Sequence, residues 1–438
     1  MLDFFRDLFL TKIISAIVKW FKQLFSFIRK NKIKKFYRVI NSKEFKEFEL
    51  AVLKQYYGEE FFTLVNNAMY PAFSVKYEDV DVIATKNIRD FDHLTSNTSE
   101  LRVTFKEEEH QGYKKNLYYK KYNEIVGSKI KAPNRPGFLL KEINLNNDNM
   151  TSFSARIGTY AENVYSTHAL EYEMYEVYLV AKKKKWTVGN NYPDIHKLLK
   201  LRNKIHSDVD QANYYESMRK SLLSGNLHET LLSVQMIVLM KENDTYNIKL
   251  IQRSDNVAIS PGKYQIVPAG GFEILNDSSN GYTPHEILEN SSSSCAVFRE
   301  YLEEIFGRNE FEGHGVGSVN EVLMKDEEIV YINELIKNNK AHFGFLGCIV
   351  DLILLRHELS FYLVIDDEDY SLRHKFIGNE EIKNHAFISN INIDNFEEDI
   401  EIWEDLLAPG AAIWKLFKET KIYSNIKNKA SSHFKVGW

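Results

Sequence analysis

The stretch Cys295–Gly307, CAVFREYLEEIFG, constrains this chain most, because it predicts a helix with two chemically opposite faces. One face carries large apolar side chains: Phe298, Tyr301, Leu302, Ile305 and Phe306. The other face carries Glu300, Glu303 and Glu304, spaced i, i+3, i+4. Carboxylates crowded on one helical face repel each other unless something neutralises them. Two interpretations follow: a bound divalent cation such as Mg²⁺ or Mn²⁺, or a solvated acidic face in which Arg299 pairs with Glu303.

The length and composition indicate a folded, multidomain chain. Its 438 residues predict two or three domains, and 44% hydrophobic with 27% charged residues is typical of soluble protein. A net charge of −5 gives no strong signal for nucleic-acid binding. Cys295 and Cys348 form no motif, which favours a reducing compartment. Abundant Lys, Asn, Ile and Tyr with scarce Pro is compatible with a bacterial cytoplasmic protein.

Residues 1–40 predict an amphipathic basic helix. Lysines interrupt its apolar run, so no membrane-spanning helix is expected, and early acidic residues argue against a signal peptide. A cationic face opposite Trp20 and several phenylalanines is typical of a helix that lies on an anionic membrane. One interpretation is that residues 2–35 bind an anionic membrane peripherally, at its inner face. The alternative is packing on the protein's own core or in a homo-oligomer.

Residues 41–225 predict a separate α/β domain whose residues do not indicate a function. The segment Ser42–Tyr57 has a helical pattern, and so does Tyr192–Leu223. Within the latter, Arg202 and His206 share a helical face, and we interpret them as a surface pair rather than a phosphodiester site. A Ser-Gly-Asn break after this helix sets the predicted domain boundary at residue 225.

Residues 226–438 show the most specific pattern of the chain. Apolar runs predict strands over Leu231–Met240, Tyr246–Gln252, Lys263–Val267, His342–Leu355 and Glu358–Asp366, with a closing helix over Leu406–Glu419. The third run leads into Pro268–Glu273, PAGGFE. Its Gly270 and Gly271 lack a Cβ, so the backbone there can approach a ligand closely.

Strands, a glycine turn and an acidic helix in this order resemble the Nudix family of hydrolases. The family signature runs from a glycine through a glutamate to Arg-Glu-apolar-x-Glu-Glu-x-Gly. This chain supplies Gly271 and then Arg299-Glu300-Tyr301-Leu302-Glu303-Glu304. The resemblance covers residues 226–425 and implies an α/β/α sandwich with a mixed sheet, in a chain of α+β class. More weakly, the segment resembles Nudix domains of bacterial nucleotide-signalling defence systems.

The sequence departs from the signature at three places. A loop is inserted from Phe272 to Ser294. The glutamate that normally follows the glycine is replaced by Asp277, with Glu273 as a competing candidate. An additional residue precedes Gly307, which still suits a helix end. The first two departures put the substrate geometry in question more than the metal ligands.

The resemblance implies a site and a reaction. Glu300, Glu303 and Glu304 would bind Mg²⁺ or Mn²⁺ with a backbone carbonyl near Gly271, and Arg299 would orient the carboxylates. Gly270 and Gly271 would bind phosphate. The reaction would be that of a Nudix-type pyrophosphohydrolase, cleaving a phosphoanhydride in a nucleotide or nucleoside-diphosphate-linked compound.

Other assignments stay open. Asp366–Asp369 or Glu380–Glu381 could place a further carboxylate over the site, although solvated loops are the commoner case. The alternative function is a catalytically silent nucleotide sensor or effector in bacterial signalling or anti-phage defence. The simplest alternative is an α/β protein whose acidic helix is only a surface.

Overall fold

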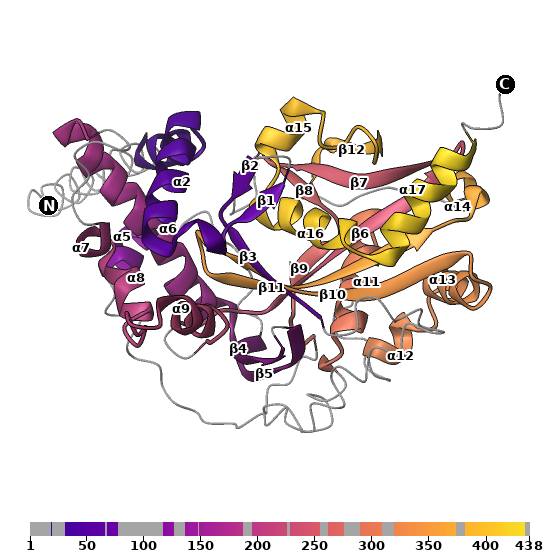
Figure 1. Cartoon of the computed structure of the whole chain (residues 1–438), viewed down its shortest axis with the longest axis horizontal. Coiled ribbons are helices and arrows are strands. Elements are labelled where there is room, and N and C mark those ends of the chain that lie inside the picture. Colours follow the sequence, from indigo (N-terminus) through magenta and orange to yellow (C-terminus); the bar gives the residue numbers. More distant parts are fainter. Residues whose placement is uncertain are drawn as a thin grey trace, which may run out of the picture.

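The computed structural model describes residue 19 and residues 31–65, 68–77, 117–126, 136–147, 149–186, 195–225, 228–254, 262–275, 290–308, 319–373 and 382–433. Helices and strands are both present, and helices surround a central sheet (Figure 1). The prediction for residues 2–30 therefore lies outside the described residues, apart from the helical Lys19.

The central sheet has eight strands in a mixed arrangement. β6 and β11 run parallel, and every other neighbouring pair is antiparallel. The main path has the order β12-β7-β6-β11-β10-β3, while β8 pairs with β7 and β9 with β6. The α+β class with a mixed sheet is confirmed. The strands are β3 (Ala72–Lys76), β6 (Ser233–Glu242), β7 (Thr245–Arg253), β8 (Tyr264–Ile266), β9 (Ala269–Gly271), β10 (Ala341–Asp351), β11 (Arg356–Ile365) and β12 (Ile382–Asn392).

Helices cover both faces of this sheet, because its central strands are apolar on both sides. Val234 and Met236 of β6 join a hydrophobic cluster with α11 (Ser293–Phe306) and α13 (Glu327–Lys337). Ile237 and Leu239, which point the other way, join a cluster with α16 (Ala408–Lys418). The strands and the closing helix predicted in residues 226–438 are thus present with small shifts at their ends.

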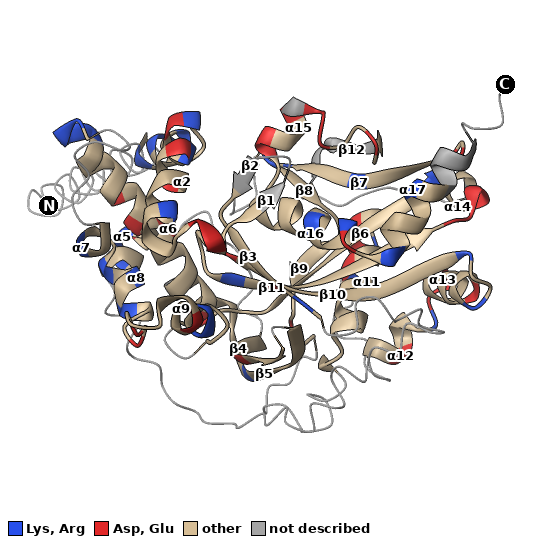
Figure 2. Ribbon diagram, in the orientation of Figure 1, with Lys and Arg blue, Asp and Glu red and all other residues tan. Residues whose placement is uncertain are grey.

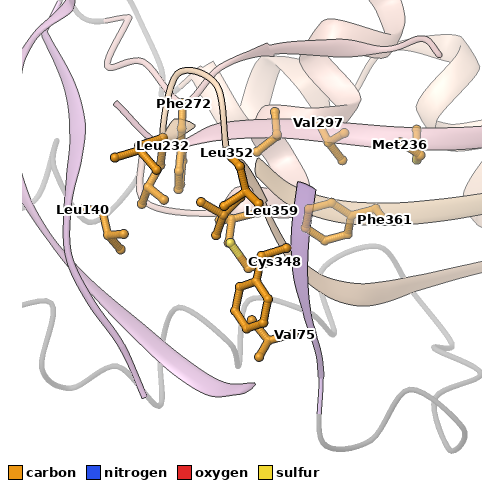
Figure 3. Packing of buried hydrophobic residues seen from close by; sticks show 14 of the residues in the cluster. Val75, Leu140, Leu232, Met236, Phe272, Val297, Cys348, Leu352, Leu359 and Phe361 are labelled. Atoms are coloured by element: carbon orange, nitrogen blue, oxygen red, sulfur yellow. The ribbon is translucent and has the colours of Figure 1, made fainter. Parts of the chain in front are cut away.

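The sheet and its core continue across residue 225. Strand β3 pairs with β10 from Val75↔Cys348 to Ala72↔Asp351 and forms one edge of the sheet. The cluster in Figure 3 contains residues from both sides of the predicted boundary, including Val75, Leu140, Leu232 and Phe361. The division into domains stays a prediction, but it does not correspond to a break in packing.

The region before residue 225 supplies a hairpin and a set of helices. β4 (Pro136–Asn146) and β5 (Asn149–Thr159) form the hairpin, which leads into α6 (Tyr160–Lys184). A capping box fixes the start of α6: Thr159 accepts a hydrogen bond from the Glu162 amide, and the Glu162 carboxylate accepts one from Thr159 N–H. The predicted helix Ser42–Tyr57 is α2 (Lys43–Tyr57), with Ser42 as its N-cap.

The helix predicted over Tyr192–Leu223 is wrong as a single element. Three short helices occur instead: α7 (Ile195–Leu198), α8 (Lys200–Ile205) and α9 (Tyr214–Leu222). Between α8 and α9, the Asp210 carboxylate accepts a hydrogen bond from the Ala212 amide at 2.9 Å. Side chains that bond to nearby backbone in this way compete with helical hydrogen bonds.

The remaining elements lie around this framework: η1 (Glu59–Phe61), β1 (Thr63–Val65), β2 (Ala68–Tyr70), α5 (Leu117–Val126), α12 (Val319–Leu323), α14 (Glu368–Arg373), α15 (Ile400–Asp405) and α17 (Lys421–His433). Residues 31–40 are also helical, and Phe36 packs against Tyr172 and Tyr175 of α6. Within the described residues, none of the helices combines the length and apolarity that a membrane crossing requires.

Candidate active site

The acidic helix forms where the sequence predicts it. α11 begins after Ser292, whose hydroxyl accepts a hydrogen bond from the Cys295 amide at 3.2 Å. It ends at Gly307, which adopts a left-handed conformation with φ of 61° and donates its N–H to the Leu302 carbonyl. Phe298 packs against Phe343 of β10, with ring centroids 4.8 Å apart. The helix is therefore anchored on the sheet by its apolar face.

The opposite face of α11 is not a solvated surface. The Glu304 residue is 3% exposed, and the Glu300 side chain is 15% exposed. Both are covered because α11 lies beside β9 as well as β6. Figure 2 shows acidic residues of α11, in red, near these strands. Buried carboxylates need polar partners or a counter-ion. The interpretation of the glutamates as a solvated face is thus wrong for Glu300 and Glu304.

Strand β9 brings the glycine turn against these carboxylates. The Ala269 amide donates a hydrogen bond to Glu304 Oε2 at 2.8 Å. At the next residue, a Cβ built on Gly270 would lie 2.1 Å from Glu300 Cδ, so the Glu300 carboxylate occupies the space that glycine leaves. Two glutamates one helical turn apart therefore lie against two consecutive residues of one strand.

Arg299 connects the same two elements. It is 6% exposed, and its Nη2 donates to the Gly271 carbonyl at 3.4 Å and lies 3.6 Å from Glu300 Oε1. The partner of Arg299 is thus Glu300 and the glycine turn, not Glu303 one turn further along. The Gly271 carbonyl, expected to assist a metal ion, is itself an acceptor for Arg299.

The donor chemistry of the site fits a hard divalent cation, since Mg²⁺ and Mn²⁺ prefer carboxylate oxygens. The contact between Glu300 and Gly270 shows that the glycine makes room for a carboxylate at the turn. The described residues, however, contain no group of three or more His, Cys, Asp or Glu side chains arranged to hold one metal ion. Metal binding by Glu300, Glu303 and Glu304 stays a prediction.

The additional carboxylates expected over the site are elsewhere or undescribed. Asp366 accepts a hydrogen bond from Tyr246 at 2.6 Å, and Asp367 pairs with Lys340 at 2.9 Å. Residue 365 pairs with Met240 of β6 whereas Ala269 pairs with Gln235, so the two sets are about 17 Å apart along the strand. The placement of Asp366–Asp369 over the site is therefore wrong.

Of the candidates for the glutamate after the glycine, only Glu273 is described. A Cβ built on Gly271 would lie 3.2 Å from Glu273 Cγ and Oε1, so this side chain is close to the turn. Asp277 and Glu380–Glu381 lie outside the described residues.

Arg202 and His206 belong to the interior, not the surface. Arg202 is 0% exposed and donates to the carbonyls of Leu352 and Ile353, both at 2.6 Å, in the β10–β11 turn. It also donates to Tyr57 Oη at 2.8 Å, and that hydroxyl lies 3.1 Å from His206 Nε2. Burial lowers the pKa of His206 well below its usual range. The predicted surface pair is wrong, and the network ties α2 and α8 to the sheet.

Two parts of the site were not anticipated from the sequence. One is the Ala269 amide that binds Glu304, and the other is the β4 backbone, which pairs with Phe272 directly after the glycines. Both contacts involve main-chain atoms, so the residue types carry no signal for them.

No protein-family model matches the chain, and no curated protein sequence matches it. Among solved structures, a Nudix hydrolase from Alicyclobacillus acidocaldarius is similar over 43% of this chain and 90% of its own, with 11% identity and a TM-score of 0.24. At that TM-score the likeness carries no argument about this chain, and the assignment depends on the residues described above.

Proposed function

We propose that this chain is a divalent-cation-dependent hydrolase that cleaves a phosphoanhydride bond in a nucleotide or nucleoside-diphosphate-linked compound. The observation that carries the proposal is the close approach of two α11 carboxylates to consecutive residues of the glycine strand β9: Glu304 is hydrogen-bonded to Ala269, and Glu300 lies against Gly270. Burial of a carboxylate costs free energy, so an acidic helix that serves only as a surface is not expected to bury these groups against a glycine turn.

Each residue then has a role of its own. Arg299 holds the Glu300 carboxylate beside the Gly271 carbonyl and offsets part of the negative charge. Glu304 is fixed in direction by the Ala269 amide. Glu303 is half-buried and would be the third carboxylate of the set. A Mg²⁺ or Mn²⁺ ion bound by Glu300, Glu303 and Glu304 would neutralise the pyrophosphate and lower the pKa of an attacking water.

The glycines give the substrate access to the backbone. Gly270 and Gly271 carry no side chain where α11 approaches β9, and the Glu300 carboxylate fills the space beside Gly270. Phosphate would then bind the backbone of this turn when that carboxylate moves aside. One of the carboxylates, Glu300 in our assignment, accepts the proton of the attacking water.

The second candidate function is a nucleotide sensor without turnover, in bacterial signalling or anti-phage defence. The hydrogen bond that Glu304 accepts from the Ala269 amide favours it, since this carboxylate already has a partner within the protein. In a sensor of this kind, ligand binding would alter the glycine turn without cleaving the ligand.

The test is hydrolysis by full-length wild-type protein and Glu303→Gln, with Mg²⁺ or Mn²⁺ and a panel of dinucleotides, nucleotide sugars and nucleoside triphosphates. Products are separated by chromatography. Glu334→Gln on the exposed face of α13 is the matched control, because it removes the same charge away from the site. We expect the first variant to lose turnover and the control to retain it. Turnover that persists in Glu303→Gln rejects the catalytic assignment, while tight nucleotide binding without product supports the sensor.

We also propose an anionic membrane surface as a partner of residues 2–35, with a homo-oligomer as the alternative. In the described part of that segment, Ile33 is buried in the protein's own core, as is Phe36 directly after the segment. Lys32, Lys34 and Lys35 are exposed on the other side of the same helix. The cationic side is therefore the one available to a partner.

A further inference from the structure

Three backbone segments meet in a closed ring of hydrogen bonds beside the glycine turn. Phe138 of β4 donates its N–H to the Phe272 carbonyl at 3.0 Å, and Phe272 donates to the Leu232 carbonyl at 2.9 Å. Leu232 donates in turn to the Phe138 carbonyl at 2.8 Å. Phe272 directly follows Gly271, so a strand from the region before residue 225 fixes the end of the glycine turn.

The attachment extends on both sides of this ring. Ile274 donates to the Pro136 carbonyl at 2.9 Å, and Leu140 donates to the Thr230 carbonyl at 2.9 Å. The side chains add to it, since Leu140, Leu232 and Phe272 belong to one hydrophobic cluster with Val297 of α11 (Figure 3). These hydrogen bonds and apolar contacts together make β4 a firm support for the turn.

Gly137 is the point of closest approach. It forms an isolated bridge with Glu273, and a Cβ built on it would lie 2.9 Å from the Phe272 carbonyl oxygen. The same Cβ would lie 2.5 Å from Leu231 Cδ1. The leucine side chain can rotate away, but the carbonyl is backbone and can give way only if Phe272 moves. A side chain at residue 137 would therefore displace the turn itself.

We propose that strand β4 is a structural part of the hydrolytic site and that Gly137 is a positioning residue for the Gly270–Glu273 segment. The proposal rests on the proposed function. Displacement of Phe272 carries Gly271 and Gly270 with it, and with them the Ala269–Glu304 hydrogen bond and the Glu300 contact. Strand β4, from the region before residue 225, would then be required for metal affinity.

The experiment compares Gly137→Ala with Gly158→Ala in the full-length chain. Gly158 faces Gly137 across the hairpin, but the three atoms nearest to a Cβ there all belong to side chains, those of Leu139 and Glu162. Mn²⁺ binding is measured by electron paramagnetic resonance, and thermal unfolding is recorded for each variant. We expect Gly137→Ala to weaken Mn²⁺ binding by roughly tenfold or more, as for other groups that orient metal ligands, and Gly158→Ala to leave it unchanged. Equal Mn²⁺ affinity in both variants overturns the proposal.

A second readout separates this proposal from the proposed function. If the wild-type protein binds no Mn²⁺, the hydrolase assignment fails, but hydrogen exchange of the Ala269 amide still reports on the turn. Exchange of that amide should be faster in Gly137→Ala than in Gly158→Ala, and equal rates would remove the positioning role. Should Gly137→Ala fail to fold, native-state exchange of the wild-type protein decides. The amides of Phe138, Leu232 and Phe272 should then open together, and early opening of Phe138 alone contradicts the proposal.

Discussion

Gly270 and Glu300 share one small volume: a Cβ on the glycine would lie 2.1 Å from Cδ and from Oε2 of the glutamate. The atoms in conflict are the far end of a flexible side chain, not backbone. A small substituent at residue 270 would therefore push the carboxylate aside while leaving the strand in place.

Gly270→Ala is predicted to impair hydrolysis at the site while leaving the stability of the fold nearly unchanged. Because Glu300 can rotate away, we expect cooperative unfolding with a free energy within about 1 kcal/mol of wild type, and a loss of divalent-cation-dependent hydrolysis of about tenfold or more. Steady-state kinetics and thermal denaturation measure the two effects. Gly271→Ala is the milder comparison, since its Cβ would meet Glu273 at 3.2 Å. Wild-type hydrolysis in Gly270→Ala would show that the position of Glu300 is not important.

Arg202→Met is predicted to destabilise the whole chain. The guanidinium bridges Tyr57 of α2 and the carbonyls of Leu352 and Ile353, so its loss leaves buried acceptors without a donor. We expect the free energy of unfolding to fall by about 3–5 kcal/mol, measured by urea denaturation. Lys204→Met, at an exposed position of the same helix, should change it by less than about 0.5 kcal/mol. Equal stability of the two variants would contradict the structural role of Arg202.

Glu49→Gln is predicted to change how stability depends on pH. Burial, with a smaller effect from Glu171 and Asp351, raises the pKa of Glu49 from 4.5 to about 8. The folded state thus holds a proton that the unfolded state loses, so wild-type stability falls as the pH rises from 4.5 through 8. The slope is about 1.4 kcal/mol per pH unit for one proton.

The variant Glu49→Gln has no titrating group at this position, so it removes the pH dependence of stability that Glu49 causes. We expect Glu49→Gln to approach wild type near pH 5 and to be more stable by on the order of 4 kcal/mol at pH 9, in urea denaturation series across this range. Glu47→Gln, at an exposed position of α2, is the control and should follow the wild-type profile. A variant profile parallel to wild type would show that Glu49 does not titrate in this window.

Membrane binding by the amino-terminal helix is predicted to depend on its exposed cations. Removal of residues 1–40 would also remove buried Ile33, Phe36 and Ile40, so a charge variant is the cleaner test. We expect replacement by glutamine at Lys32, Lys34, Lys35 and Arg38 to reduce flotation with phosphatidylserine vesicles. The favourable free energy of membrane binding should fall by about 1 kcal/mol for each charge removed.

The matched control removes as many charges from another exposed region: Lys197, Lys200, Lys204 and Lys220. It should float like wild type. If the two quadruple variants float equally, the membrane proposal for residues 2–35 is removed, and concentration-dependent sedimentation would then test the homo-oligomer.

The elements of residues 231–418 were largely predictable, for a physical reason. Buried central strands such as β6 are apolar on both faces, so they appear as continuous apolar runs whatever they pair with. α11 likewise shows its period of 3.6 residues and its glycine end directly in the sequence. Errors arose where polar side chains turned inward, as with Arg202 and His206, which a helical pattern alone assigns to the surface.

By itself, the sequence determined the charged residues and the glycines of the site in this protein. The charged residues are Arg299, Glu300, Glu303 and Glu304 on one helix, and the glycines are Gly270 and Gly271 on one turn. Only the tertiary structure decided that Glu304 binds the Ala269 amide, that Arg299 contacts Gly271, and that Gly137 supports the turn. These contacts join segments far apart in the chain, largely through backbone atoms. Local patterns report side-chain type and period, whereas such long-range backbone pairing is fixed only when the sheet and its helices pack together.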